Sequence, residues 1–140
     1  MLGKAEVLKE GTDITIVAIG KTVARAMRIA EKLEKEEIQA EVINCRFLKP
    51  LDTQTIKESI EKTKTVITIE DGTSINGLGT AVEELIIEEK LENIDFQKFA
   101  YPDEFIKHGS VEELEKIYGL DEENILKKAE ELIRTKCSII

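Results

Sequence analysis

Apolar residues along the chain follow two alternating spacings. Short β-branched runs predict four buried strands, at residues 14–19, 40–47, 65–69 and 94–101. Between these runs, apolar residues recur every three or four positions, which predicts helices with one face packed on a sheet. These helical stripes lie at residues 26–33, 52–60, 78–86, 111–117 and 125–133. A weaker signal predicts a short strand at residues 6–9, within an opening segment of residues 1–10.

Several of the predicted helices begin with capping signals. Asp52 is a suitable N-cap for the helix that follows it, because its short side chain can accept a bond from a free backbone amide. Residues 110–113 form a capping box, and Asp121 is placed to cap the next helix. We therefore expect two closing helices within residues 111–134, followed by a tail at residues 135–140.

Strands and helices alternate along the chain, which is typical of right-handed βαβ crossovers. We therefore expect an α/β fold with a mostly parallel sheet, helices on both faces, and a single domain over residues 1–140. Ligands of such sheets usually lie beyond the carboxyl ends of the strands. Those ends are predicted at residues 20–22, 46–50, 70–76 and 101–108.

Composition and charge narrow the classes of function. The chain has 140 residues, of which 41% are hydrophobic and 35% are charged, as expected of one folded domain. A net charge of -9 argues against binding to nucleic acid or to an anionic membrane, since both require clustered Lys and Arg. The first fifty residues are nearly neutral, with 9 basic and 8 acidic groups, and are the better place for a buried partner surface.

Cysteine and histidine are scarce. With only Cys45, Cys137 and His108, the chain cannot form a disulfide framework, a thiolate zinc site or a multi-histidine metal centre. The N-terminus lacks the apolar stretch of a signal peptide, and no apolar run is long enough to span a membrane. These features predict a cytoplasmic protein in which Cys45 is a core residue and Cys137 a tail thiol.

Two glycine motifs partly match phosphate-binding loops. Gly20-Lys21-Thr22 follows a strand and precedes a helix, but residues 16–19 belong to the strand, so no loop remains to wrap a phosphate. Gly77-Leu78-Gly79 opens a helix but lacks the third glycine of a dinucleotide motif. We expect Gly77 and Gly79 to allow a close backbone approach, and an anion held at this helix N-terminus is the alternative.

Other polar residues lie at the predicted strand ends. Arg46 suits a bidentate bond to a carboxylate or phosphate, although an ordinary ion pair is the simpler interpretation. Glu70 and Asp71 suit acid–base or magnesium chemistry, but neighbouring strand residues point to opposite faces, so solvated loop acids are expected. His108, with Asp103 near it in sequence, suits a general base, yet no nucleophile accompanies the pair. No complete active site is predicted.

Three stretches of the sequence resemble one family. Residues 44–52 (Asn-Cys-Arg-Phe-Leu-Lys-Pro-Leu-Asp) and residues 68–82 resemble segments of the C-terminal domain of transketolase-type enzymes. Residues 101–110 (Tyr-Pro-Asp-Glu-Phe-Ile-Lys-His-Gly-Ser) look like the end of one branch of that family, the 1-deoxy-D-xylulose-5-phosphate synthases. The opening residues 3–11 also resemble the start of that domain, so the resemblance covers residues 3–134.

The resemblance implies a three-layer α/β/α domain with a five-stranded mixed sheet whose first strand is antiparallel. Synthases of this branch join pyruvate to glyceraldehyde 3-phosphate, release carbon dioxide and form 1-deoxyxylulose 5-phosphate, a precursor of isoprenoids, thiamine and pyridoxal. Thiamine diphosphate and magnesium are their cofactors, and the motifs that hold them belong to two other domains. This chain contains neither the GDG nor the NN motif, so the resemblance assigns it no catalytic, cofactor-binding or metal-binding residue.

Two main hypotheses follow. In the first, the chain is the non-catalytic C-terminal domain of such a synthase, inactive alone, whether excised or one piece of a split enzyme. It would support the homodimer and the remaining domains. In the second, it is a stand-alone regulatory or interaction module with an anion on Arg46 and the amides at Gly77 to Gly79. Asp103 and His108 are further candidate anion or interface positions. The end of a split transketolase or of a 2-oxo-acid dehydrogenase β subunit is a further alternative.

Overall fold

The computed structural model describes residues 3–48, 50–73, 77–102 and 109–138. Within these residues the chain forms five strands and five helices, in an order that follows the predicted alternation. Their bounds are β1 (Glu6–Lys9), β2 (Ile14–Ala18), α1 (Thr22–Glu34), β3 (Ala40–Asn44), α2 (Thr53–Thr63), β4 (Thr65–Thr73), α3 (Leu78–Glu88), β5 (Asp95–Tyr101), α4 (Val111–Ile117) and α5 (Glu122–Ser138).

The strands form one mixed sheet in the order β1-β3-β2-β4-β5. β1 runs antiparallel to β3, while the β2–β3, β2–β4 and β4–β5 pairs are all parallel. This confirms the five-stranded mixed sheet, including the antiparallel first strand. The parallel order brings the carboxyl ends of β2, β4 and β5 to the same edge of the sheet.

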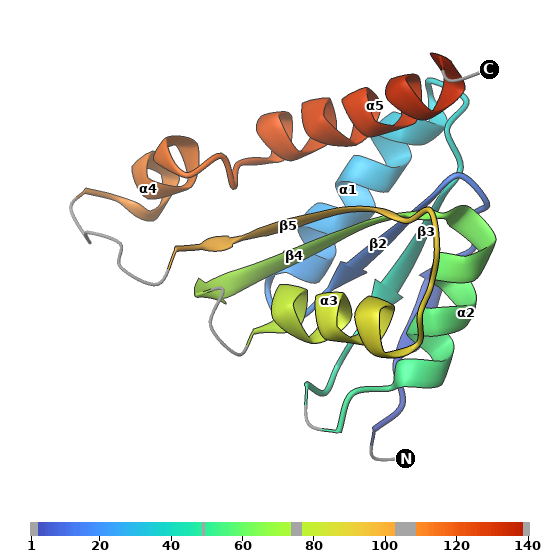
Figure 1. Cartoon of the computed structure of the whole chain (residues 1–140). Helices are drawn as coiled ribbons and strands as arrows, with labels where there is room; N and C mark the ends of the chain where they lie inside the picture. Colours follow the sequence, from blue (N-terminus) through green and yellow to red (C-terminus); the bar gives the residue numbers. More distant parts are fainter. Residues whose placement is uncertain (1–2, 49, 74–76, 103–108, 139–140) are drawn as a thin grey trace.

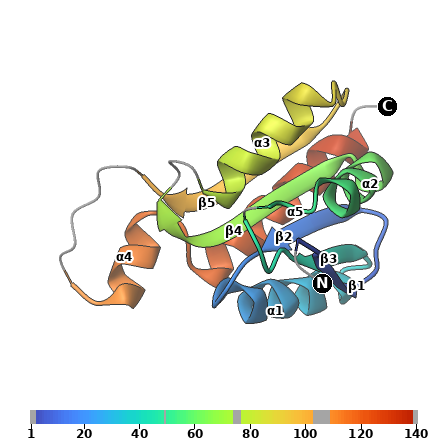
Figure 2. The ribbon, with the colours of Figure 1, turned by 90° about the horizontal axis from the view of Figure 1, so that it is seen from below.

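Helices cover both faces of the sheet, as Figures 1 and 2 show, so the three-layer α/β/α architecture is confirmed. On one face, α1 and α5 bury a cluster that includes Ile16, Leu33 and Ile125. On the other face, α2 and α3 bury a second cluster that includes Ile43 and Val82. All five of these side chains have no solvent exposure, so each layer is fixed to the sheet by tightly packed apolar contacts.

Three element ends differ from the predictions. β3 ends at Asn44 rather than at residue 47, because Arg46 adopts a φ of 61°, which turns the chain out of the strand. β4 continues to Thr73, past the predicted loop start at residue 71, because Thr73 pairs with Tyr101 after a register shift. α5 runs through the predicted tail to Ser138, and the Lys136 ammonium anchors its last turns by donating to the Thr63 carbonyl at 2.6 Å.

Asp52 fixes the start of α2 and also holds the opening segment of the chain. One carboxylate oxygen accepts from the Thr55 amide at 3.2 Å, and the other accepts from the Thr55 hydroxyl at 2.7 Å and from the Ala5 amide at 2.9 Å. The predicted N-cap is thus confirmed. Burial raises the pKa of Asp52, but the bonds from Thr55 and Ala5, with the Lys4 charge, outweigh it and leave the pKa below its ordinary value of 3.8.

Replacing Asp52 by alanine is expected to lower the free energy of unfolding at pH 7 by about 1–2 kcal/mol. Folding lowers the pKa of Asp52, so the ionised carboxylate stabilises the folded state. This stabilisation is complete above pH 3.8, the ordinary pKa of the group, and is lost as the pH falls through the pKa that Asp52 has in the folded protein. Urea unfolding of both proteins at pH 7 and in strong acid measures the effect, with the exposed Glu61→Ala as control. If Asp52→Ala lowered the free energy of unfolding by the same amount at both pH values, the stabilising role of the ionised Asp52 carboxylate would be contradicted.

Candidate functional site

A cavity of about 530 Å³ lies at the carboxyl edge of the sheet, beside β2, β4 and β5. Ligand sites of parallel sheets usually form at this edge. The segment that contains α4 supplies the opposite wall. The polar residues lining the cavity are Lys21, Thr22, Arg25, Glu70, Asp71, Tyr101 and Glu115.

Glu70 is the central polar residue of this edge, and only 6% of it is exposed. Its two carboxylate oxygens accept hydrogen bonds from the first amides of α3, at 2.9 Å from Leu78 and 2.7 Å from Gly79. The carboxylate satisfies two amides that have no partner within the helix, and its charge opposes the positive end of the helix dipole. Glu70 therefore joins β4 to the start of α3.

These bonds correct one expectation. Glu70 is a buried, engaged carboxylate and not the solvated loop acid that was expected, because the start of α3 lies beside it. The alternative of an external anion at Gly77 to Gly79 would require that anion to displace Glu70 from the Leu78 and Gly79 amides. The signal available in the sequence was an acid near a strand end, followed eight residues later by a helix that opens with glycines.

Gly79 allows the close backbone approach that the sequence predicts. A Cβ atom at this position would lie 2.7 Å from the Lys98 Cβ and 3.0 Å from the Thr68 hydroxyl oxygen. Both distances are shorter than ordinary contacts, so only glycine lets the start of α3 rest directly on β4 and β5. This contact places the Gly79 amide within reach of Glu70.

The Gly20-Lys21-Thr22 turn has a structural role. The Thr22 hydroxyl oxygen lies 2.8 Å from the Ile19 carbonyl oxygen and 2.9 Å from the Ile69 carbonyl oxygen, so its one hydrogen is shared between them and links the start of α1 to β4. These two carbonyl groups engage the hydroxyl that would contact a metal-bound phosphate in a P-loop. The contacts of Thr22 thus agree with the predicted strand–turn–helix junction.

An ion pair closes the other side of the cavity. The Arg25 guanidinium donates to the Glu115 carboxylate and, at 2.9 Å, to the Leu120 carbonyl. Arg25 and Glu115 are only 24% and 16% exposed, so this pair is better shielded from solvent than an ordinary surface pair. This ion pair connects α1 to α4. The Glu115 carboxylate compensates the positive charge of Arg25, which weakens the attraction of Arg25 for an anionic ligand.

Tyr101 ends β5 at the cavity, with its ring packed edge-to-face on Tyr118 at a centroid distance of 5.7 Å. Burial raises the pKa of Tyr101, and the nearby carboxylates of Glu115 and Asp71 raise it further, against the opposing effect of Arg25. Its phenol is therefore protonated at neutral pH, so Tyr101 adds no charge to the cavity.

Arg46 and Cys45 lie outside this cavity. Arg46 is exposed, and its guanidinium stands 5.6 Å from the centre of the Phe47 ring, in a cation–π contact. No carboxylate of the described residues forms an ion pair with it. Cys45 is 1% exposed, which confirms it as a core residue, and burial raises the pKa of its thiol to about 11. Neither of the two cavities at the described residues is lined by Arg46, Gly77 or Gly79.

The remaining predicted positions, Asp103 and His108, lie outside the described residues. Among the residues that the structure does describe, no group of three His, Cys, Asp or Glu side chains is placed to hold a metal ion. Likewise, none of the helices in the described ranges has the length and apolar character needed to cross a membrane.

Comparisons with known proteins identify relatives of this domain. The family model "Transketolase, C-terminal domain" matches residues 3–125. The 1-deoxy-D-xylulose-5-phosphate synthase of Desulforudis audaxviator is 41% identical over 129 residues, which cover 92% of this chain and 20% of the relative. The enzyme of the same name from Caldanaerobacter subterraneus is 42% identical over 124 residues, which cover 89% of this chain and 20% of that relative. The chain thus spans about a fifth of the length of the curated relatives it matches.

Solved structures agree with this relationship. A structure described as a split gene transketolase, in an inactive β4 tetramer, has a TM-score of 0.84 and 36% identity, and the match covers 94% of this chain and 43% of that one. A transketolase variant from Pichia stipitis has a TM-score of 0.66 at 19% identity, over 95% of this chain and 18% of that one, which shows a shared fold. The chain belongs to the transketolase C-terminal domain family.

Proposed function

We propose that the chain is the non-catalytic C-terminal domain of a 1-deoxy-D-xylulose-5-phosphate synthase. The observation that carries this proposal is the 41% identity to such a synthase over 92% of the chain. In this role the domain supports the homodimer and the other domains of a cytoplasmic enzyme, which joins pyruvate to glyceraldehyde 3-phosphate and releases carbon dioxide. The engaged groups at the carboxyl edge support a stabilising role.

Thiamine diphosphate and magnesium would be held by the other domains of that enzyme. The bonds within the domain support this assignment, because Glu70 already accepts from the Leu78 and Gly79 amides and Glu115 engages Arg25. Lys21 also lines the cavity, but one lysine is a weak basis for holding a diphosphate. We therefore assign this chain no step of the reaction.

One observation favours a second candidate, the C-terminal part of a split transketolase. The solved split gene transketolase is 36% identical over 94% of this chain, nearly as similar as the synthases. The two candidates share the same supporting role and differ in the substrates of the catalytic domains. The stand-alone anion-binding module is less well supported, because the Leu78 and Gly79 amides are already bonded to Glu70.

A chimeric enzyme tests the proposal. The Desulforudis audaxviator synthase, with its matching fifth replaced by this chain, is expected to form 1-deoxyxylulose 5-phosphate at a rate within about tenfold of the native enzyme. The control carries instead the corresponding segment of the Pichia stipitis transketolase, which shares the fold at 19% identity to this chain. A folded chimera with this chain that is no more active than the control would contradict the proposal.

A further inference from the structure

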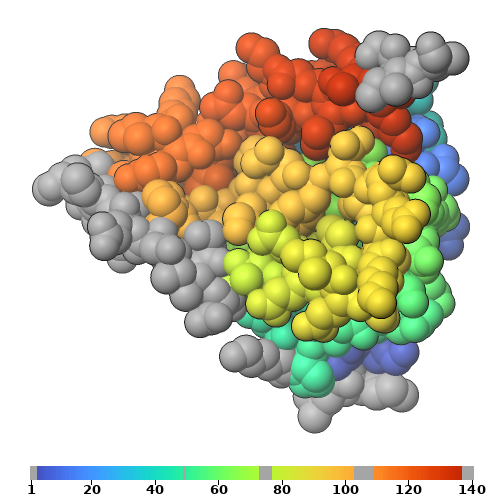
Figure 3. All heavy atoms as spheres, in the orientation of Figure 1, coloured from blue at the N-terminus to red at the C-terminus, as the bar shows by residue number. Residues whose placement is uncertain are grey.

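α4 is less firmly held by the domain than α5 is. Among residues 109–117 only Leu114 is buried, and at the end of the helix the Tyr118 ring contacts Tyr101. In Figures 1 and 2 α4 lies beyond the end of the sheet, and Figure 3 shows it, in orange, at the outer end of the α5 side. α5 instead packs on α1 through Ile125, which has no solvent exposure and belongs to the core.

Two glycines in the left-handed region of φ flank α4. Gly109 has a φ of 95° and Gly119 has a φ of 70°. Gly119 also ends the helix, since the Leu120 amide, just beyond it, donates to the Glu115 carbonyl at 2.7 Å. Glycine tolerates a wide range of backbone angles, so a change at these two positions can turn α4 as a unit. Such a movement breaks the bond from Leu120 and leaves the hydrogen bonds within α4 intact.

The inner side of α4 does not pack fully on the sheet. Val111, Leu114 and Glu115 line the carboxyl-edge cavity from α4, and Ile69 lines it from β4. The cavity volume of about 530 Å³ is in the range of small-molecule pockets. Because Ile69 is only 1% exposed, a reagent in solution does not reach this part of the cavity while α4 stays in place.

The Arg25–Glu115 ion pair spans the turn at Gly119. The Arg25 guanidinium, on α1, donates to the Glu115 carboxylate on α4 and, at 2.9 Å, to the Leu120 carbonyl on the other side of the turn. One side chain thus fastens α4 to the residue that follows it. Since Arg25 and Glu115 are only 24% and 16% exposed, solvent screens this attachment less than it screens an ordinary surface pair.

We propose that α4 is a lid over the carboxyl-edge cavity, which moves about Gly109 and Gly119 and is latched by the Arg25–Glu115 ion pair. The closed lid shields the apolar side of the cavity, and its opening gives small molecules in solution access to that side. Opening removes Leu114 from the domain and leaves both core clusters buried on the sheet, so it requires far less free energy than global unfolding. The lid is a property of the domain itself and does not depend on the proposed function.

Labelling of engineered cysteines with a thiol reagent tests the lid. Ile69→Cys places a thiol in the cavity wall. Ile67→Cys is the matched control, because Ile67 belongs to the same strand and the same core cluster but does not line the cavity. Both variants are made in a Cys137→Ser background, and the native Cys45, in the other core cluster, reports global unfolding. We expect Ile69→Cys to react at least about tenfold faster than Ile67→Cys.

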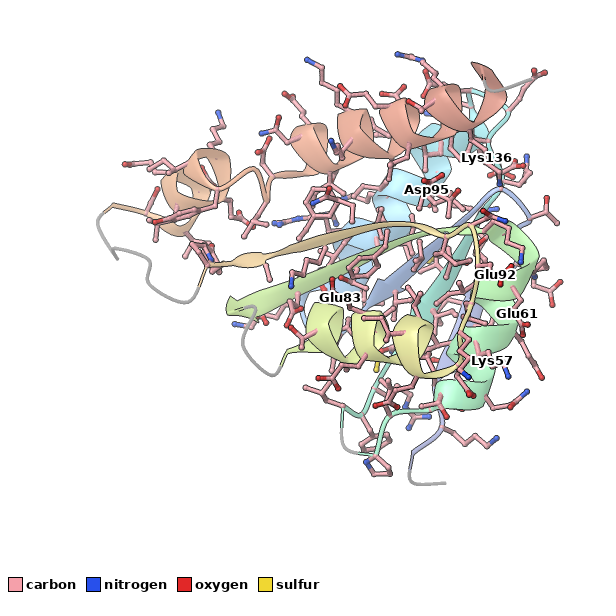
Figure 4. The ribbon with its side chains drawn as sticks, in the orientation of Figure 1. Lys57, Glu61, Glu83, Glu92, Asp95 and Lys136 are labelled. Atoms are coloured by element: carbon pink, nitrogen blue, oxygen red, sulfur yellow. The ribbon has the colours of Figure 1, made fainter. Side chains whose placement is uncertain are left out.

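The substitution Glu115→Gln tests the latch, since it removes the charge and keeps the length of the side chain. It is expected to raise the labelling rate of Ile69→Cys by about threefold to tenfold and to leave that of Ile67→Cys unchanged. The control Glu83→Gln removes an ion pair with Lys98 that joins α3 to β5. Figure 4 shows Glu83 on α3, and its replacement should leave labelling at position 69 unchanged.

Equal labelling at positions 67 and 69 would overturn the proposal, and so would a rise at both positions in Glu115→Gln, because exposure would then require global unfolding. An unchanged rate at position 69 in Glu115→Gln would also overturn it. If circular dichroism shows that Ile69→Cys does not fold, Leu114→Cys on the lid itself takes its place. Its labelling should rise with Glu115→Gln while Cys45 stays unlabelled, and simultaneous labelling of both cysteines would contradict the lid.

Discussion

Replacing Glu70 by alanine is expected to lower the free energy of unfolding by about 2–4 kcal/mol, since it removes two hydrogen bonds to a charged acceptor and leaves two amides without partners. The Leu78 and Gly79 amides that it serves belong to residues that are themselves buried. The start of α3 should fray, and its contact with β4 and β5 should weaken.

Urea unfolding followed by circular dichroism measures this loss, and Asp71→Ala is the matched control. Asp71 is the next residue along β4 but is exposed, so its replacement should change the free energy of unfolding by less than about 0.5 kcal/mol. Equal stability of Glu70→Ala and Asp71→Ala would show that the carboxylate does not hold α3.

The substitution Gly11→Ala is expected to cost about 3 kcal/mol or more, because the added methyl group meets backbone atoms that cannot rotate away. A Cβ at Gly11 would lie 2.4 Å from the Ala40 carbonyl carbon and 2.6 Å from the Gln39 carbonyl oxygen. Relief requires the β1–β2 connection to move away from the start of β3. That shift would disturb the bond by which the Gly11 amide donates to Glu41 at 3.2 Å.

Thermal unfolding compares Gly11→Ala with Gly72→Ala. A Cβ at Gly72 would have no atom within 4 Å, so this variant should be within about 0.5 kcal/mol of the native chain. If Gly11→Ala unfolds at the same temperature as Gly72→Ala, then the close contact between Gly11 and the start of β3 is not present in solution.

Local patterns in the sequence predicted most of the fold, because each depends on residues close together in the chain. The caps at Asp52 and Ser110 are both confirmed: the Ser110 hydroxyl accepts from the Glu113 amide at 3.2 Å, as a capping box requires. The weak signal for β1 has a physical cause. Glu6, Val7 and Leu8 of this edge strand are exposed, so no alternation of apolar and polar residues marks it.

The site was harder to predict, since its contacts join distant parts of the chain. Strand alternation holds within β4, where Glu70 is buried and Asp71 is exposed, but it does not indicate that the start of α3 lies beside Glu70. The Arg25–Glu115 pair joins residues 90 positions apart, and no pattern within either helix indicates it. The contact made by Gly79 could be anticipated, because glycine at the start of a helix leaves room for a neighbouring element to lie against the backbone.

Titration calorimetry of the isolated 140-residue chain with thiamine diphosphate and magnesium tests most directly whether this domain supports an enzyme without carrying its chemistry. We predict no saturable binding, because the α3 amides are held by Glu70 and no described cluster of residues is placed to hold the metal. The full-length Desulforudis audaxviator synthase is the positive control. Binding of the cofactor to the isolated chain at micromolar concentration would contradict the proposed role.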